Sequence, residues 1–326
     1  MTPISFTHLD IPIIRSCNLA CKGCITHSDH KKIKGTVKVD ESLEWLKFWS
    51  ERLKPSSVTV FGGEPLLHPE FTKWVTTVRG LWDYSTSVRI NTNGYYLDTI
   101  YDDIPALFGA NNSIMLIVSV QTGTDPYLSK VYSNIETLKQ RIVDYHLSRT
   151  GAGIKTAEWR IMIDEYEVNY KRWYRFFIND HATPLIMAVC DQYKLTWMTH
   201  YGGHGEQMRT VYDYNAEWYV DNHKFCQAKD FVTLYRGKLW KCPPMGVLEH
   251  TLDTFGIKNT PVWQPFLDRY TTVDTNSSDE EIAKWFAQQN TPEQVCNMCA
   301  FTGPKNIRIE AEERSHHLKN HWKYSL

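Results

Sequence analysis

Cys17-Asn-Leu-Ala-Cys21-Lys-Gly-Cys24 places three thiols within eight residues, with three and then two residues between them. A loop this short can bring all three sulfur atoms to one object a few ångströms across. Thiolates are soft ligands that select iron–sulfur clusters, zinc or Cu(I). Because a structural zinc site closes its tetrahedron with four ligands, three cysteines on one loop favour a four-iron cluster with one open iron. The alternative is a zinc loop that His27 or His30 completes.

The composition describes a globular chain of 326 residues, of which 42% are hydrophobic and 13% aromatic. Its formal net charge of -1 gives no electrostatic signature of binding to duplex nucleic acid or to an anionic membrane, and leaves a local basic groove open. The longest apolar run, near Ile114–Val118, is far too short to span a bilayer. The sequence shows no secretory signal, and metal-binding thiols suit a reducing compartment, so we expect a cytoplasmic protein.

A second motif, Phe61-Gly-Gly-Glu-Pro65, follows a β-branched segment at 57–61 that predicts a strand. Two glycines allow the backbone to approach a ligand closely, although a plain strand-to-helix turn is the alternative. With the CxxxCxxC loop on the preceding strand, the turn resembles the GGE motif of the radical S-adenosylmethionine (SAM) family. The resemblance implies a [4Fe-4S] cluster on Cys17, Cys21 and Cys24, whose open iron binds SAM. It also implies that Gly62, Gly63 and Glu64 bind the SAM amino group.

Strand-like and helix-like segments alternate along the first two thirds of the chain. We expect strands near 11–14, 57–61, 88–91, 113–120, 159–163 and 195–199, and helices near 40–53, 69–79, 97–107, 134–145 and 170–177. Asp40 and Asn134 are expected to cap two of these helices. The alternation predicts a parallel α/β sheet with ligands at the carboxyl ends of its strands. Six such units fit a partial (β/α)6 barrel, the fold that the resemblance implies.

The pattern changes after about residue 205, so we expect a barrel at 1–210 and a smaller domain at 211–326. Segments 231–235 and 239–241 flank Gly237 and predict a hairpin. Ser278 and Glu281 form a capping box that predicts a short helix. The smaller domain is therefore expected to be a hairpin-plus-helix extension that binds a cluster.

A second group of cysteines lies in this extension, with 15, 53 and 2 residues between Cys226, Cys242, Cys296 and Cys299. The spacing by itself resembles a zinc ribbon. After a radical SAM barrel it resembles the Twitch extension, a shortened relative of the SPASM domain. That resemblance implies an auxiliary [4Fe-4S] cluster. Because four thiols leave no iron open, such a cluster would carry electrons rather than bind substrate.

The resemblance also implies further SAM contacts at the ends of later strands, from Asn91, Asn93, Ser119, Gln121 and Arg160. The chain departs from the family at two places: relatives often carry Asp at the position of Gln121 and an aromatic residue at that of Gly23. No catalytic residue is identified. The residues expected to contact substrate lie in a Gly-rich loop after the sixth expected strand: Tyr201, His204 and Glu206.

By resemblance, SAM is cleaved to methionine and a 5′-deoxyadenosyl radical that removes a hydrogen atom from the substrate. With the auxiliary cluster as electron acceptor, we expect a dehydrogenation-type oxidation of a small polar metabolite or nucleotide. A flavodoxin or ferredoxin would donate the electrons. Three alternatives stay open: a peptide- or protein-modifying enzyme, a redox-neutral isomerase or epimerase, and a zinc-binding structural protein.

Overall fold

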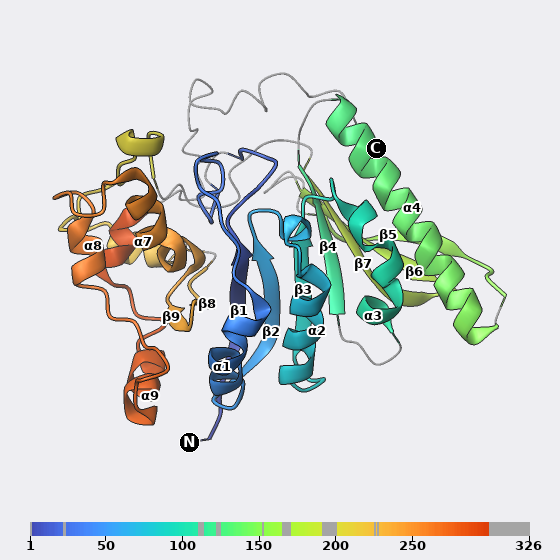
Figure 1. Ribbon diagram of the computed structural model, residues 1–326, viewed down its shortest axis with the longest axis horizontal. Helices are drawn as coiled ribbons and strands as arrows, with labels where there is room; N and C mark the ends of the chain where they lie inside the picture. The colour runs from blue at the N-terminus through green and yellow to red at the C-terminus, as the bar shows by residue number, and fades with distance from the viewer. Residues whose placement is uncertain are drawn as a thin grey trace.

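The computed structural model describes residues 2–21, 24–109, 114–121, 125–151, 153–164, 171–190, 201–224, 226 and 228–299. Within these ranges one nine-stranded sheet has the order β5-β6-β7-β4-β3-β2-β1-β8-β9 (Figure 1). Its strands are β1 (Ile4–Ile14), β2 (Leu53–Gly62), β3 (Ser87–Thr92), β4 (Ile114–Val120), β5 (Ala157–Asp164), β6 (Lys171–Ile178), β7 (His181–Cys190), β8 (Phe231–Tyr235) and β9 (Lys238–Trp240).

The α-helices are α1 (Val39–Ser50), α2 (Phe71–Leu81), α3 (Ile104–Phe108), α4 (Asp125–Thr150), α6 (Tyr219–Lys224), α7 (Pro243–Phe255), α8 (Gln264–Asp268) and α9 (Asp279–Ala287). Short 3-10 helices are η1 (Pro65–Leu67), η2 (Leu97–Asp103), η3 (Gly205–Gln207) and η4 (Gln294–Met298). Among the helices of the described residues, none has both the length and the apolar character that a transmembrane span needs.

The sheet is mixed, which confirms an α/β fold. Strands β8, β1, β2, β3, β4 and β7 run parallel, whereas β5, β6 and β9 are antiparallel to their neighbours. The expected helix at 170–177 is therefore wrong, because 171–178 is strand β6. Asn179 and Asp180 both have positive φ (48° and 66°), as the two central residues of a type I′ hairpin turn require. The expected strand at 195–199 lies outside the described residues.

Two expected helix caps are also wrong. Lys38, not Asp40, precedes α1, and Asp40 lies in the first turn, where its carboxylate accepts a hydrogen bond from Lys73 at 2.7 Å. Asn134 lies inside α4, and its side-chain amide donates to the carbonyls of Gly94 (3.3 Å) and Tyr95 (2.9 Å). A polar residue that suits a helix start also suits a buried helix face when a neighbouring turn offers acceptors.

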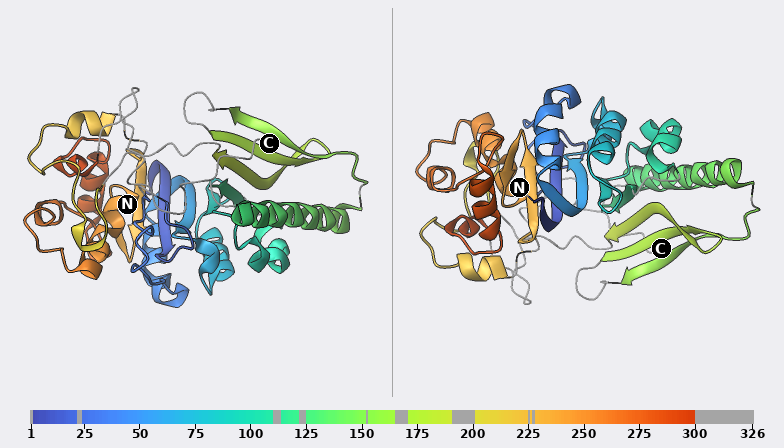
Figure 2. Two further views of the ribbon diagram at one scale, coloured as in Figure 1. Left: turned by 90° about the horizontal axis from the view of Figure 1, so that it is seen from above. Right: turned by 90° about the horizontal axis from the view of Figure 1, so that it is seen from below.

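The sheet has one apolar face, and its other face is polar along β1 and β2 but carries a small apolar cluster of Ile117, Ile186 and Ala188 on β4 and β7. Leu9, Ile11, Val58 and Val60 alternate along β1 and β2 and pack into the core that contains Trp49 and Trp74 of α1 and α2. Figure 2 shows α1, α2 and α3 on this side, while β5, β6 and β7 curve away on the other side. We call the other side the inner face.

The predicted hairpin and capping box are confirmed, as β8–β9 and at the start of α9. The hairpin does not stand apart from the sheet, since β8 pairs in parallel with β1. A second apolar core gathers residues between Tyr201 and Met298 around α7 and includes Trp240 and Trp263. The C-terminal part therefore has its own apolar core but shares the sheet with the rest of the chain, and the division at residue 210 stays a prediction.

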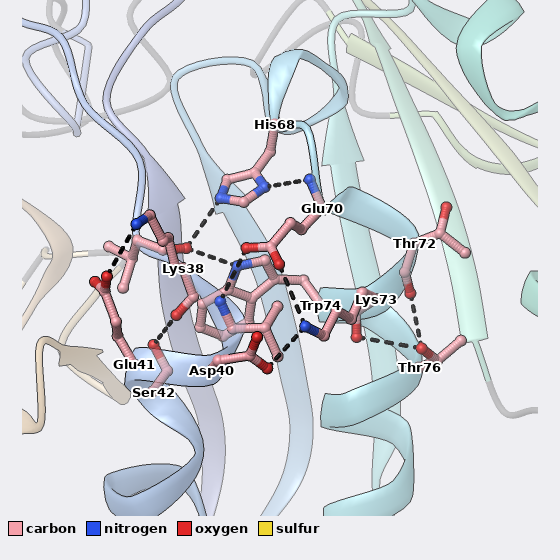
Figure 3. A network of polar contacts seen from close by, with 12 residues as sticks. Lys38, Asp40, Glu41, Ser42, His68, Glu70, Thr72, Lys73, Trp74 and Thr76 are labelled. Carbon is pink, nitrogen blue, oxygen red and sulfur yellow. Dashed lines mark hydrogen bonds and ion pairs between the residues drawn. The ribbon is translucent and has the colours of Figure 1, made fainter.

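The segment that leaves the cysteine loop is tied to α2 by a polar network (Figure 3). The carbonyl of Val37 accepts hydrogen bonds from His68 (2.9 Å) and from the Trp74 indole (2.8 Å). Glu70 accepts from the backbone N–H of Val39 at 3.2 Å, which satisfies one of the free donors at the start of α1. The network sets where α1 begins and so how the loop returns to the sheet.

Candidate functional site

The first cysteine loop begins just past the carboxyl end of β1, where the sequence predicts a ligand site. Cys17, Cys21 and Cys24 are all half-buried. The backbone N–H of Leu19 donates to the sulfur of Cys17 at 3.4 Å, and the Thr26 hydroxyl lies 3.3 Å from the sulfur of Cys24. Donors aimed at sulfur stabilise thiolates and metal-bound sulfur. The three thiols and these donors fit an iron–sulfur cluster.

Burial raises the pKa of the Cys17 thiol to about 12 and also raises that of Cys24. The thiols of Cys17 and Cys24 are therefore protonated near neutral pH until a metal binds, and metal binding has to displace their protons. His27 and His30 direct their Nδ1 atoms to the Thr251 hydroxyl (2.9 Å) and the Gly205 N–H (3.2 Å). Neither of these contacts joins a histidine to the cysteines.

The glycine pair of the Gly-Gly-Glu turn packs directly on the start of the cysteine loop. A Cβ atom on Gly62 would lie 2.1 Å from the carbonyl oxygen of Ile14, and one on Gly63 would lie 2.1 Å from that of Ser16. The backbone N–H groups of Gly63 and Glu64 donate to these same two oxygens, at 2.8 and 2.9 Å. The sequence predicts a close approach of backbone to ligand, and the structure shows a close approach of backbone to the cysteine loop.

The Glu64 side chain is fully buried and links this turn to the end of β3. One carboxylate oxygen accepts from the Thr92 hydroxyl (2.6 Å) and the Leu66 N–H (3.0 Å), and the other accepts from the Asn93 N–H (2.8 Å). Despite these three donors, burial raises its pKa to about 7. Glu64 therefore positions Asn93 in this conformation, and direct binding of the SAM amino group stays a prediction.

Asn93 joins β3 to the cysteine loop. Its amide nitrogen donates to the side chain of Asn18 at 2.8 Å and lies 4.0 Å from the sulfur of Cys17. The buried Tyr127 hydroxyl donates to its carbonyl at 3.1 Å. The sequence did not indicate Asn18, Thr92 or Tyr127, although Asn18 lies inside the cysteine motif and Thr92 lies between Asn91 and Asn93.

The other expected SAM contacts are less closely tied to the loop. Asn91 is exposed on the inner face, and Ser119 and Gln121 are half-buried at the end of β4. Arg160 forms surface ion pairs with Glu158 (2.7 Å) and Asp180 on the β5 side of the sheet. In the described part of the chain Arg160 therefore forms ordinary surface ion pairs, and these contacts do not support its expected role in binding SAM.

The loop with the expected substrate contacts lies against the residues that follow the first cysteines. The Tyr201 hydroxyl donates to Asp29, and the His204 ring stacks on His30 with centroids 4.2 Å apart. Glu206 lies next to them in η3. Burial raises the pKa of Asp29 to about 6.

Asp29, His30 and His204 each place one possible ligand atom within 4.8 Å of the other two. Their geometry does not suit a metal ion. A metal lies in the plane of each imidazole that binds it, so two stacked rings cannot aim nitrogen atoms at one ion. Nδ1 of His30 also accepts a hydrogen bond from the Gly205 N–H. This group is better suited to hydrogen bonding than to metal binding.

The second group of cysteines comes together in the second core. The thiols of Cys226, Cys242 and Cys296 all act electrostatically on Cys299, so the four sulfur atoms lie near one another. Burial raises the pKa of all four thiols, that of Cys296 to about 11. The donor set fits a tetrahedral zinc ion and a four-iron cluster equally well.

Hydrogen bonds hold the second group in place. The Asn222 amide donates to the carbonyls of Cys296 (3.0 Å) and Cys299 (2.7 Å). Lys241, buried beside Cys242, donates to Glu293 at 2.7 Å. Cys242 precedes the first turn of α7, so the helix dipole favours negative charge at its sulfur.

Comparisons with known proteins match the first half of the chain to a family. Residues 11–146 match the model of the radical SAM superfamily. Matching solved structures include BtrN in complex with AdoMet and 2-DOIA (12% identity, 97% of this chain and 98% of that chain, TM-score 0.44). Streptococcus suis SuiB bound to S-adenosylmethionine also matches (13% identity, 86% and 66%, TM-score 0.41).

Native anSMEcpe with bound AdoMet and Cp18Cys peptide matches at 20% identity over 43% of this chain and 41% of that chain, with a TM-score of 0.30. The chain thus spans less than half of that structure. Comparison with curated proteins finds no match. The match to the radical SAM superfamily model covers the cysteine loop, the Gly-Gly-Glu turn and Asn93.

Proposed function

We propose that this chain is a radical SAM oxidoreductase with an auxiliary iron–sulfur cluster. The observation that carries the proposal is the joining of Cys17, the Gly-Gly-Glu turn and Asn93 at the carboxyl edge of the sheet. When bound, a [4Fe-4S] cluster and SAM supply a 5′-deoxyadenosyl radical, and a second cluster supplies an acceptor for the electron that the substrate loses. The sheet would correspond to the partial barrel of the family.

The proposed role of the residues of this site is to position the cysteine loop and the strand ends, and not to react themselves. Gly62 and Gly63 hold the loop against β2, since any side chain there would push the loop away. Glu64 fixes the ends of β2 and β3 relative to each other and is the proposed partner of the SAM amino group. Fixed strand ends would help to position a substrate carbon for the radical that SAM supplies, and such positioning is the main contribution a protein makes to this chemistry.

The part of the inner face on β1 and β2 supports a polar substrate. His8, Asp10, Ser57 and Thr59 project there, with the His8 ring 2.6 Å from the Ser57 hydroxyl and 3.0 Å from Asp10. Barrels whose interior is only a packed core fill it with branched apolar side chains. Towards the carboxyl edge the same face exposes Asn91. We therefore propose a small polar metabolite or a nucleotide as substrate, and a flavodoxin or ferredoxin as electron donor.

Metal content tests the proposal directly. Anaerobically purified protein is expected to hold about eight irons in two four-iron clusters. Replacing Cys17, Cys21 and Cys24 with Ala should remove about half of the iron and all SAM cleavage. The matched control is Cys190→Ala, at a cysteine outside both groups, which should keep both. Stoichiometric zinc without a brown chromophore would contradict the proposal.

A second experiment asks whether the second cysteine group carries electrons. In a folded Cys296→Ala/Cys299→Ala variant, dithionite-reduced protein should still form 5′-deoxyadenosine. It should yield little oxidised product and should return substrate that has exchanged hydrogen. If product equals deoxyadenosine one for one in the variant, the second group is structural, and a redox-neutral reaction becomes the better proposal.

A further inference from the structure

Arg15 lies immediately after β1, two residues before Cys17, and only 1% of its surface is exposed. One guanidinium nitrogen donates to the Val247 carbonyl (3.2 Å) and the His250 ring (3.3 Å). The other donates to the Thr26 carbonyl (2.9 Å) and the Thr251 hydroxyl (2.8 Å). Arg15 thus joins the cysteine loop to α7, which begins at Cys242 of the second group.

Every one of these acceptors is neutral. Burial, together with Arg15 and Arg236, lowers the pKa of His250 to about 4, so its ring is uncharged near neutral pH. Among the described residues, no carboxylate forms an ion pair with Arg15. A buried cation without an anion costs several kcal/mol, and a guanidinium does not lose its proton in a protein.

Of the groups that act electrostatically on Arg15, Tyr235 and Cys24 can carry negative charge, and Cys24 is the one that belongs to a candidate metal-binding loop. The Thr26 carbonyl accepts from Arg15, while the hydroxyl of the same residue lies 3.3 Å from the sulfur of Cys24. A four-iron cluster held by three thiolates is an anion, and reduction adds a further negative charge. Charge near a cluster is one of the factors that set its reduction potential.

We propose that Arg15 is the internal counter-ion of the cluster on the first cysteine loop, a positioning residue that raises its reduction potential. The inference rests on the proposed function of that loop. It also gives α7 a role as the link between the two cysteine groups. A helix rises 1.5 Å per residue, so the stretch from Cys242 to Thr251 spans about 13 Å. Arg15 thus fixes the first loop to the helix that begins at the second cysteine group.

The test is the midpoint potential of the SAM-responsive cluster, from an anaerobic redox titration followed by EPR on the full chain. Arg15→Met removes the charge and should make reduction at least tenfold less favourable, which is a shift of about 59 mV to lower potential. Arg15→Lys keeps the charge and should restore most of the potential. An unchanged potential in a fully loaded Arg15→Met variant overturns the proposal.

Arg79→Met is the matched control. Arg79 lies in α2 and is also buried. Its guanidinium donates to the backbone carbonyls of Thr86, Trp82 and Asp83. Its loss should lower stability without moving the potential. A shift equal to that of Arg15→Met would show that the potential follows general destabilisation, and the proposal would fail.

A second pair of variants covers the case in which Arg15→Met does not fold. His250→Asp keeps Arg15 and gives it a carboxylate partner, so it should lower the potential, whereas His250→Asn should leave it near wild type. Equal potentials in these two variants overturn the proposal. If both Arg15 variants fold but lose iron, hydrogen bonding rather than charge is responsible, and the proposal also fails. Wild-type protein without any iron–sulfur cluster would instead contradict the proposed function.

Discussion

Gly63→Ala is expected to damage the protein although it adds one methyl group. The new Cβ would lie 2.1 Å from the Ser16 carbonyl oxygen, where ordinary contacts begin near 3.4 Å, so the backbone must separate by more than an ångström. That movement weakens the hydrogen bonds from Gly63 to Ile14 and from Glu64 to Ser16. Two hydrogen bonds at about 1 kcal/mol each, with roughly 1–3 kcal/mol for overpacking, predict a loss of about 3–5 kcal/mol.

Gly80→Ala is the matched control for this substitution. Gly80 lies in α2, and a Cβ there would meet nothing within 4 Å, so alanine should stabilise the helix by up to about 1 kcal/mol. Anaerobic thermal unfolding should show a Tm several degrees lower for Gly63→Ala, and an unchanged or higher Tm for Gly80→Ala. Iron content after reconstitution should fall only in Gly63→Ala. Wild-type Tm and iron content in that variant would refute the reasoning.

Three further predictions concern single side chains. Glu64→Gln turns an amide N–H₂ towards a backbone N–H such as that of Asn93, and should weaken SAM binding in anaerobic calorimetry while iron content stays near normal. Burial raises the Asp29 pKa from 3.8 to about 6, so between these values the folded state holds a proton that the unfolded state has lost, and the free energy of unfolding should fall as the pH rises from about 4 to about 6. Asp29→Asn should remove this fall, and a variant with the same pH profile as wild type would contradict the prediction. Asn134→Ala should cost about 1–3 kcal/mol in denaturant unfolding, since the Tyr95 carbonyl loses its donor, and a loss below 0.5 kcal/mol would show that water replaces the amide.

Local features of the chain were predictable because their causes lie within a few residues. The three thiols of the first loop need only their spacing to meet one cluster. The β8–β9 hairpin depends on Gly237 in its turn, and the start of α9 depends on Ser278 and Glu281, which contact each other across one helical turn. Strand β6 was missed because its aromatic residues, such as Trp173 and Phe177, also suit one face of a helix. The signal that distinguishes the two is the Asn179-Asp180 turn, where both residues have positive φ.

Contacts between distant segments were decided only by the tertiary structure. The sequence indicates that Gly62 and Gly63 permit a close approach, but pairing of β1 with β2 determines that the cysteine loop approaches them. Likewise, the sequence does not indicate that Arg15 is buried. Its partners Val247 and Thr251 on α7 lie more than 230 residues away along the chain. Spacing along the chain determines which atoms can reach one ligand, whereas burial and charge balance depend on segments that only folding brings together.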